Sequence, residues 1–150
     1  MMSYYMENNI LLDASFLIAL VFYQDTHYQQ ATMLFNNALR DKPIFITNNY
    51  LFSEAMTMTL IRSKQIKYCN ALKEQTFNGI NTIFKMYYID NLFNEEIDRL
   101  FLNQQKYKSE FLSFSDCSLI VQARKQKIKT IFTFDSTFKQ FHREFRIMGV

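Results

Sequence analysis

The chain has 150 residues, a length that suits one domain with a substantial hydrophobic core. Its hydrophobic content of 49% and charged content of 21% are ordinary for a globular protein, and the apolar run over residues 10–22 contains Asp13 and is too short to cross a bilayer. The formal net charge of +3 is unevenly distributed, because residues 106–150 carry 9 Lys and Arg against 4 Asp and Glu. This excess fits a solvated surface as well as it fits an anionic partner.

The numbers of glycine, proline and cysteine residues further limit the possible folds and structural sites. Two glycines and one proline argue against an all-β fold with many tight turns. Cys69 and Cys117 lie far apart and lack metal-ligand spacing, so neither a disulfide framework nor a structural zinc site is expected. The start of the chain lacks the positive flank of a secretory signal. We therefore expect a cytoplasmic protein with no membrane segment.

Strands and helices alternate in the predicted chain. In order, the predicted elements are a strand at 9–13, helices at 15–23 and 26–39, a strand at 43–47, helices at 48–62 and 67–85, a strand at 86–89, helices at 95–107 and 115–125, a strand at 130–134, a helical turn from 135 to 138, and a short final strand after Phe145. Gly79 weakens the helix predicted over 67–85.

This alternation is typical of βαβ units. It predicts a single α/β domain over residues 1–150, with a mostly parallel central sheet of four or five strands flanked by helices. In such sheets ligands bind outside the carboxyl ends of the strands. The residues that follow each strand are therefore the first candidates for a functional site.

Four acidic residues stand in such places. Asp13 and Asp135 follow the first and the last of the four longer strands, whereas Glu54 and Asp116 lie on apolar helix faces. Asp116 precedes Leu119, Ile120 and Ala123 by three, four and seven residues, so it shares a face with side chains that favour the core. A carboxylate on an inward face is costly unless something satisfies it.

Each acid taken singly also has a purely structural explanation. Asp13 and Asp135 suit helix caps, Asp116 suits the positive end of a helix dipole, and Glu54 is exposed if the helix phase differs. Taken together, converging carboxylates repel one another unless a cation neutralises them. Mg²⁺ takes such oxygen ligands, and it can activate water and stabilise a phosphoryl transition state. The joint pattern predicts a metal-dependent phosphodiesterase or nuclease.

Four stretches carry a family resemblance, namely I10-L-L-D-A-S-F-L-I18, F52-S-E-A-M56, L112-S-F-S-D-C-S-L-I120 and T133-F-D-S-T-F138. In this order the sequence resembles the PIN-domain ribonucleases, and among them the VapC-type toxins of prokaryotic toxin–antitoxin pairs. The resemblance implies an endoribonuclease whose acidic cluster binds Mg²⁺ or Mn²⁺. By motif, the catalytic and metal-binding acids are Asp13, Glu54, Asp116 and Asp135, and the supporting hydroxyls are Ser15 and Thr133.

The resemblance also implies partners. Members of this toxin family cut tRNA or ribosomal RNA, form homodimers, and are held inactive by an antitoxin that inserts a basic side chain among the acids. Y4-Y5 and the helices predicted over 15–23 and 48–62 offer apolar surface for such a partner. One departure concerns the loop Q126-K-I-K129, where the family usually has a glycine.

Other residues are weaker candidates. His27 and His142 lack ligand spacing, and Cys117 has no nearby histidine, so we predict surface or packing roles for them. Seven basic residues either contact phosphates or simply solvate the surface: Arg124, Lys125, Lys127, Lys129, Lys139, Arg143 and Arg146.

Two other functional classes share part of this pattern. A haloacid-dehalogenase-like phosphatase needs a second acid two residues after the first, and Ser15 stands there. A PIN-like fold retained as an RNA- or protein-binding module without activity stays open. The presence of all four acids counts against that second alternative.

Overall fold

The structure is a computed structural model that describes residues 8–77, 83–104 and 110–150. Its strands are β1 (Asn9–Leu12), β2 (Ile44–Asn48), β3 (Phe84–Tyr87), β4 (Thr130–Phe132) and β5 (Arg146–Met148). Its α-helices are α1 (Ala14–Val21), α2 (Tyr28–Ala38), α3 (Asn49–Ser63), α4 (Ile66–Phe77), α5 (Asn91–Leu102) and α6 (Phe114–Lys125), and its 3₁₀ segments are η1 (Leu39–Asp41) and η3 (Ser136–Phe141). No helix among the described residues is long and apolar enough to span a membrane.

The five strands form one parallel sheet in the order β3-β2-β1-β4-β5. The predicted α/β class with a parallel sheet is therefore confirmed, and the short final strand becomes β5 on one edge. β1 lies in the centre between β2 and β4, so the segments that leave the carboxyl ends of these three strands lie next to one another. Parallel sheets bind ligands at this carboxyl end of their strands.

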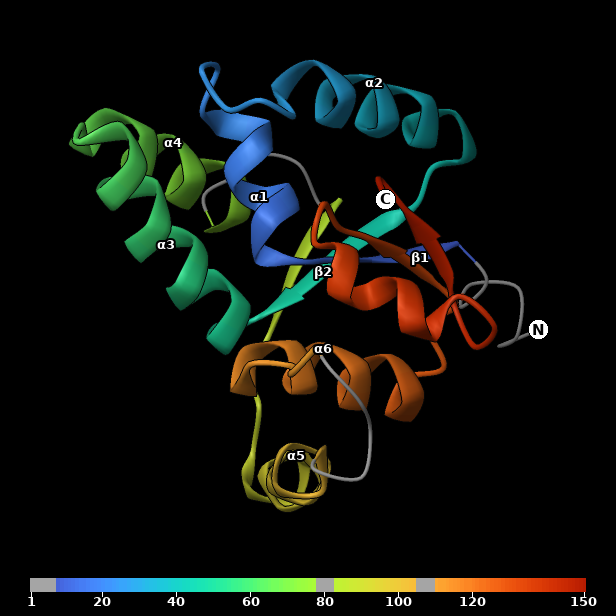
Figure 1. Ribbon diagram of the computed structural model, residues 1–150. Helices are drawn as coiled ribbons and strands as arrows, with labels where there is room; N and C mark the ends of the chain where they lie inside the picture. Colours follow the sequence, from blue (N-terminus) through green and yellow to red (C-terminus); the bar gives the residue numbers. More distant parts are fainter. Residues whose placement is uncertain (1–7, 78–82, 105–109) are drawn as a thin grey trace.

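Helices cover both faces of the sheet, and the alternation of side chains along β1 shows how (Figure 1). Ile10 and Leu12 point to one face and join a core with α1, α2 and α4, whereas Leu11 points to the other and joins a core with α6 and η3. Helix α3 supplies Leu51 to one core and Ala55 to the other. It therefore lies across the edge of the sheet, where it borders the candidate site.

A buried amide network fixes α3 against α6. Asn48 caps α3, because its Oδ1 accepts a hydrogen bond of 3.0 Å from the backbone N–H of Leu51. Its Nδ2 donates to Oε1 of Gln122 at 2.9 Å and to Oγ of Ser118 at 3.2 Å, and Asn48, Ser118 and Gln122 are all fully buried. These bonds set the separation of the two helices that carry Glu54 and Asp116.

Two predicted helices are wrong in extent. In place of the helix predicted over 67–85, α4 is described over Ile66–Phe77, and β3 covers Phe84–Tyr87, two residues before the strand predicted at 86–89. Pairing with β2 overrides the helical spacing of this stretch, because Phe84 aligns with Phe45 and their rings stack at 5.4 Å. Gly79 lies outside the described residues. The helix predicted over 95–107 starts earlier, at Asn91, because Asp90 caps it, and it ends at Leu102.

The loop without the family's glycine keeps a glycine-like backbone. Lys127 has φ 55°, in the left-handed region, directly after α6. The N–H of Ile128 bonds to the carbonyl of Ala123 at 2.9 Å, and the N–H of Lys127 bonds to that of Arg124 at 3.3 Å. These two hydrogen bonds together form a Schellman motif, which ends the helix. A lysine thus adopts the conformation that the missing glycine would take.

Candidate functional site

The four acids predicted from the sequence line one cavity of about 300 Å³ at the carboxyl edge of the sheet. Each comes from a different element. Asp13 follows β1, Glu54 lies on α3, Asp116 lies in the first turn of α6, and Asp135 caps η3. The structure therefore brings together carboxylates that are up to 122 residues apart in the chain, from Asp13 to Asp135.

Asp13 is buried, with 3% of its surface exposed. It occupies the position before α1, but its side chain makes no capping bond to that helix. Instead its Oδ2 accepts hydrogen bonds from Oγ of Ser15 at 2.8 Å and from Oγ1 of Thr133 at 2.7 Å. Burial raises the pKa of Asp13 to about 6, although both hydroxyls lower it, and the charge of Glu54 raises it further.

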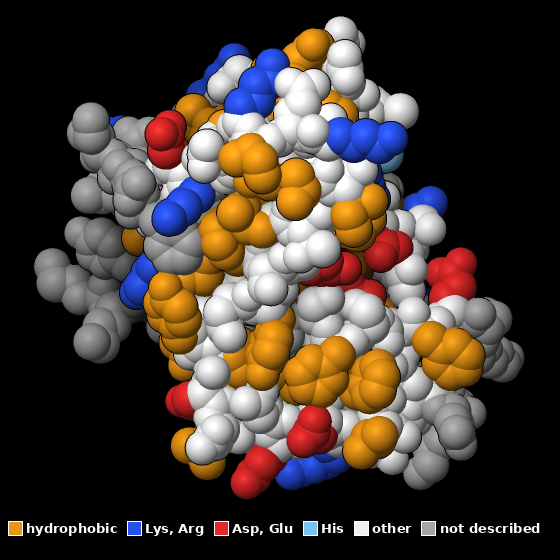
Figure 2. Space-filling model, turned by 90° about the vertical axis from the view of Figure 1, so that its left-hand side faces the viewer, with side chains coloured by type: hydrophobic (Ala, Val, Ile, Leu, Met, Phe, Trp, Pro, Cys, Tyr) orange, Lys and Arg blue, Asp and Glu red, His pale blue; other side chains and the backbone are white. Residues whose placement is uncertain are grey.

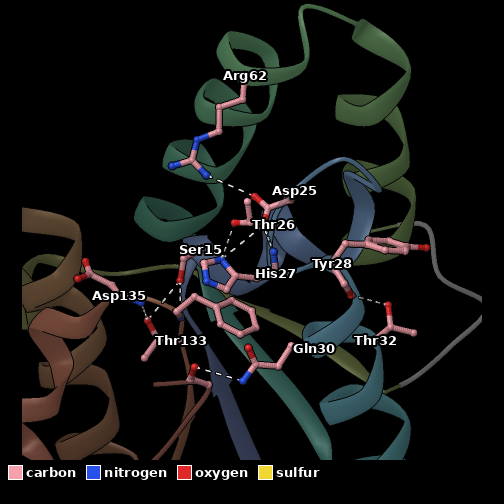
Figure 3. A network of polar contacts seen from close by, with 12 residues as sticks. Ser15, Asp25, Thr26, His27, Tyr28, Gln30, Thr32, Arg62, Thr133 and Asp135 are labelled. Atoms are coloured by element: carbon pink, nitrogen blue, oxygen red, sulfur yellow. Dashed lines mark hydrogen bonds and ion pairs between the residues drawn. The ribbon is translucent and has the colours of Figure 1, made fainter.

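The two hydroxyls also connect β1 to the segment that follows β4 (Figure 3). Oγ of Ser15 accepts from the N–H of Phe134 at 2.9 Å, and Oγ1 of Thr133 accepts from the N–H of Asp135 at 3.0 Å. Ser15 and Thr133 therefore act as a bridge between Asp13 and the backbone before Asp135. This arrangement is the structural counterpart of the two hydroxyl positions singled out in the sequence.

Asp116 takes part in a capping box. Its Oδ2 accepts from the N–H of Ser113 at 2.9 Å, while Oγ of Ser113 accepts from the N–H of Asp116 at 3.1 Å. Burial raises the pKa of Asp116 to about 7, and the charges of Asp13 and Asp135 contribute in the same direction. Asp116 thus lies in the first turn of α6, where the helix-dipole explanation places it, and its carboxylate still lies among like charges.

The other two acids are less buried. Oε2 of Glu54 accepts from Oγ of Ser115 at 2.7 Å, so this bond connects α3 with the start of α6. Oδ1 of Asp135 accepts from the N–H of Thr137 at 2.9 Å and caps η3. Each carboxylate keeps a second oxygen that these bonds do not use.

The donor set suits a hard divalent cation. All four side chains offer carboxylate oxygens, and none of them belongs to an ion pair among residues 8–77, 83–104 and 110–150. Neutral donors therefore make the hydrogen bonds to Asp13 and Asp116, and burial, together with the neighbouring acids, keeps the pKa values of both carboxyls raised. As the described side chains stand, no three of them surround a single point closely enough to hold an ion. Binding of one ion by three of these acids would therefore require a change in their side-chain rotamers.

The lining of the same cavity includes three further charged or titratable residues that the sequence did not single out as functional, namely Asp25, His27 and Arg62. Arg62 was detectable, because Glu54, Met58 and Arg62 recur at intervals of four on one face of α3 and all line the cavity. Asp25 and His27 lie in the connection between α1 and α2, where no periodicity marks them.

The basic candidates of the C-terminal third are spread over the molecule. Arg124 pairs with Glu144 at 2.6 Å and Lys125 with Glu96 at 2.7 Å, both near the end of α6 remote from Asp116. Lys139 and Arg143, by contrast, are exposed in and after η3, the segment that Asp135 opens.

Cys117 and His142 agree with the packing and surface roles expected of them. Cys117 is fully buried, and burial raises the pKa of its thiol to about 12, so a thiolate nucleophile is disfavoured. His142 is exposed, and its Nδ1 lies 2.7 Å from the carbonyl oxygen of Lys139.

Solved structures of three proteins resemble this fold. The toxin VapC20 of Mycobacterium tuberculosis, described as cleaving the Sarcin-Ricin loop, superposes with a TM-score of 0.73 at 21% identity, over 87% of this chain and 93% of that one. VapBC2 of Rickettsia felis, bound to a DNA fragment from its promoter, gives 0.62 at 10% identity over 93% and 96%. FitAcB of Neisseria gonorrhoeae gives 0.57 at 14% identity over 92% and 95%.

Comparison by sequence gives a family but no individual relative. No match was found among curated proteins. The model of the PIN domain, however, matches residues 10–144, which include all four acids and both bridging hydroxyls. Since this match covers most of the chain, and since the parallel sheet carries its acids where the motifs place them, the chain belongs to the PIN domain family.

Proposed function

We propose that this protein is an endoribonuclease that depends on Mg²⁺ or Mn²⁺ and acts as the toxin of a VapBC-like toxin–antitoxin pair. One observation carries the enzymatic part of the proposal. Four carboxylates from four separate elements line one cavity, and two of them are buried with raised pKa values and no cationic partner among the described residues. A purely structural cluster would gain stability from replacing these acids, whereas a metal site needs them.

The residues have distinct roles in this proposal. Asp13, Asp116 and Asp135 would hold the ion directly, and Glu54 would bind it directly or through water. A bound ion would supply activation of water for phosphodiester hydrolysis and stabilisation of negative charge on phosphate oxygens.

The remaining side chains position these acids. Ser15 and Thr133 orient the carboxylate of Asp13, because both donate to the same oxygen, Oδ2. The capping box holds Asp116 at the start of a helix fixed by buried contacts.

The substrate and the antitoxin are inferred from the fold and the surface. VapC20 cleaves the Sarcin-Ricin loop, and we propose an RNA substrate, tRNA or ribosomal RNA, for this chain as well. Figure 2 shows hydrophobic side chains on both sides of a recess that contains acidic side chains. Tyr23, just after α1, and Leu60 and Ile61, on α3, are exposed apolar residues. We propose that an antitoxin helix covers them and inserts a basic side chain among the acids, and that the toxin forms a homodimer.

Co-expression with the protein encoded next to this gene tests the proposal. The two proteins should co-purify, and cleavage of tRNA or ribosomal RNA should appear when the partner is removed and Mg²⁺ or Mn²⁺ is added. EDTA should abolish the cleavage. Harmless expression of the wild-type chain alone, with no cleavage at any metal concentration, would instead indicate an inactive PIN-like binding module.

The stretch Y4-Y5, which the sequence predicts as part of the antitoxin surface, lies outside the described residues.

A further inference from the structure

The cavity that holds the four acids has a second side, formed by Asp25, His27 and Arg62. We propose that His27 and Arg62, both held by Asp25, bind the RNA strand on this side: Arg62 contacts a phosphate that flanks the cleaved bond, and His27 stacks against a neighbouring unpaired base. This inference rests on the proposed nuclease function and assigns the residues that position its substrate.

Asp25 organises this side of the cavity. Its Oδ1 accepts a hydrogen bond of 2.8 Å from the backbone N–H of His27 and lies 3.6 Å from Nδ1 of the same residue. Its Oδ2 lies 3.5 Å from Nη1 of Arg62. The Asp25 side chain is only 8% exposed, whereas those of His27 and Arg62 are 46% and 47% exposed. A mostly buried carboxylate thus holds two solvent-accessible side chains that line the same cavity, and Figure 3 shows both of them beside Asp25.

Arg62 supplies a positive charge that the acidic side of the cavity lacks. A strand of RNA that reaches Asp13 and Asp116 brings phosphates next to carboxylates, which is unfavourable without a cation close by. Arg62 is two helical turns beyond Glu54 on the same face of α3, and it lines the same cavity. A guanidinium has five N–H donors in a planar fork, so one contact with Asp25 leaves donors that can bind a phosphate bidentately.

His27 offers an aromatic surface beside this charge. Its ring stacks on that of Phe134, with centroids 4.4 Å apart and an interplanar angle of 11°. Phe134 in turn stacks on the buried ring of Phe16 at 5.6 Å and lies between Thr133 and Asp135. The imidazole is therefore the outermost member of a stack that begins in the core. Unpaired bases bind to aromatic and imidazole rings arranged in this way.

Binding of RNA can be measured without cleavage in an Asp116→Asn background. The probe is a pool of 12-nucleotide single-stranded RNAs of random sequence with a 5′ fluorescein, and binding is followed by fluorescence anisotropy in Mg²⁺. Arg62→Ala should weaken binding about tenfold and lower the slope of log K against log salt by about 1. His27→Ala should weaken it about fivefold or more, and His27→Phe should restore it, because stacking needs a ring rather than a charge. Arg40→Ala is the matched control and should bind like the parent. Arg40 is exposed on η1, which precedes β2 and so lies at the amino end of that strand, away from the acids.

Kinetics in the otherwise wild-type enzyme provide a second readout. Arg62→Ala and His27→Ala should raise KM for the RNA pool while kcat changes by less than about threefold, since neither side chain holds the metal. A fully paired RNA duplex of the same length should bind more weakly than the single strand, because its bases are not available for stacking. If Arg62→Ala or His27→Ala melts at a lower temperature than the parent, KM for the RNA pool is measured instead in Arg62→Lys and His27→Phe, which keep most of the side-chain volume.

The outcomes separate the two proposals. If the wild-type enzyme cleaves RNA while Arg62→Ala and His27→Ala bind like the Arg40→Ala control, the strand contact is overturned and the nuclease assignment stands. Equal affinity for duplex and single strand would overturn the stacking role of His27. If the wild-type protein neither cleaves nor binds the RNA pool, both proposals fail together.

Discussion

The Thr133 hydroxyl donates a hydrogen bond of 2.7 Å to Oδ2 of Asp13, although the two residues are 120 positions apart. The register of the sheet makes this contact possible, because Leu12 pairs with Phe132 and the next residue of each strand follows side by side. Among the described residues Asp13 has no cationic partner. The hydrogen bond from the fully buried Thr133 hydroxyl therefore offsets part of the free-energy cost of burying the Asp13 carboxylate. Thr133 is accordingly the first residue to test.

Thr133→Val keeps the shape of the side chain and removes the hydroxyl. It takes one donor from Asp13 and the acceptor from the N–H of Asp135, so one of the two hydroxyl bridges between Asp13 and the segment after β4 is lost. We expect metal affinity to fall about 10- to 100-fold, as for other second-layer contacts to metal ligands. Isothermal titration with Mn²⁺ measures this. Thr130→Val, at the opposite end of the same strand, is the control and should leave Mn²⁺ affinity unchanged.

Asp116→Asn should preserve the fold and remove the activity. The amide oxygen can still accept from the N–H of Ser113, so the capping box survives, but the ligand charge is lost. We expect RNA cleavage to fall about 100-fold or more, and the metal-free protein to melt at a higher temperature at pH 8 because repulsion from Asp13 disappears. Asp98→Asn, on the exposed side of α5, serves as the control for loss of one charge. Full activity in purified Asp116→Asn would contradict the metal-binding role.

The stability of the metal-free protein should fall as the pH rises from about 4 to about 7. In the folded state the pKa of Asp13 is raised from 3.8 to about 6 and that of Asp116 from 3.8 to about 7. Over this range the folded protein binds more protons than the unfolded chain, so the free energy of unfolding decreases with increasing pH. Urea denaturation at pH 5 and pH 8 in EDTA should show a loss of a few kcal/mol, given about 1.4 kcal/mol per pKa unit.

Saturating Mg²⁺ should reverse this trend, because the ion binds the deprotonated acids of the folded state. Asp116→Asn should make the metal-free pH dependence shallower, since it removes the larger of the two shifts. Rising stability from pH 5 to pH 8 in EDTA would show that burial and the neighbouring acids do not raise the pKa values of these carboxyls.

Gly149→Ala should damage the site from the far edge of the sheet. Gly149 has φ 109°, and a Cβ built on it would lie 2.2 Å from the carbonyl oxygen of Thr133. An alanine therefore has to displace either the chain end or the residue that orients Asp13. We expect destabilisation of about 2 kcal/mol or more and reduced cleavage, both measured against Val150→Ala. A melting temperature equal to that of this control would show that the close approach is not maintained in solution.

Lys127→Gly should stabilise the protein. Lys127 ends the Schellman motif after α6 with φ 55°, a conformation that costs a residue with a Cβ about 1 kcal/mol. Glycine removes that cost but adds unfolded-state entropy, so we expect a gain of up to about 1 kcal/mol in chemical denaturation. Lys127→Ala loses the charge and keeps the Cβ, and it should show no gain. A stabilised Lys127→Ala would attribute the effect to charge rather than to the backbone.

The sequence by itself determined the order of the elements and the identity of the four acids. Alternating apolar strands and periodic helices are local patterns, and acids directly after strands, such as Asp13, converge in any parallel sheet. The same local reasoning failed between 67 and 85. There the apolar spacing fits a helix, but pairing of Phe84 with Phe45 converts the end of the stretch into a strand.

Only the tertiary structure decided how the acids are held and what faces them. Thr133 meets Asp13 because β1 and β4 are neighbours, although 120 residues separate them in the chain. Asp25 and His27 reach the cavity because the connection after α1 folds over Phe134 and the end of α3, as the His27–Phe134 stack and the Asp25–Arg62 contact show. Such contacts depend on which surfaces pack together, and packing is set by long-range burial of apolar area rather than by local spacing.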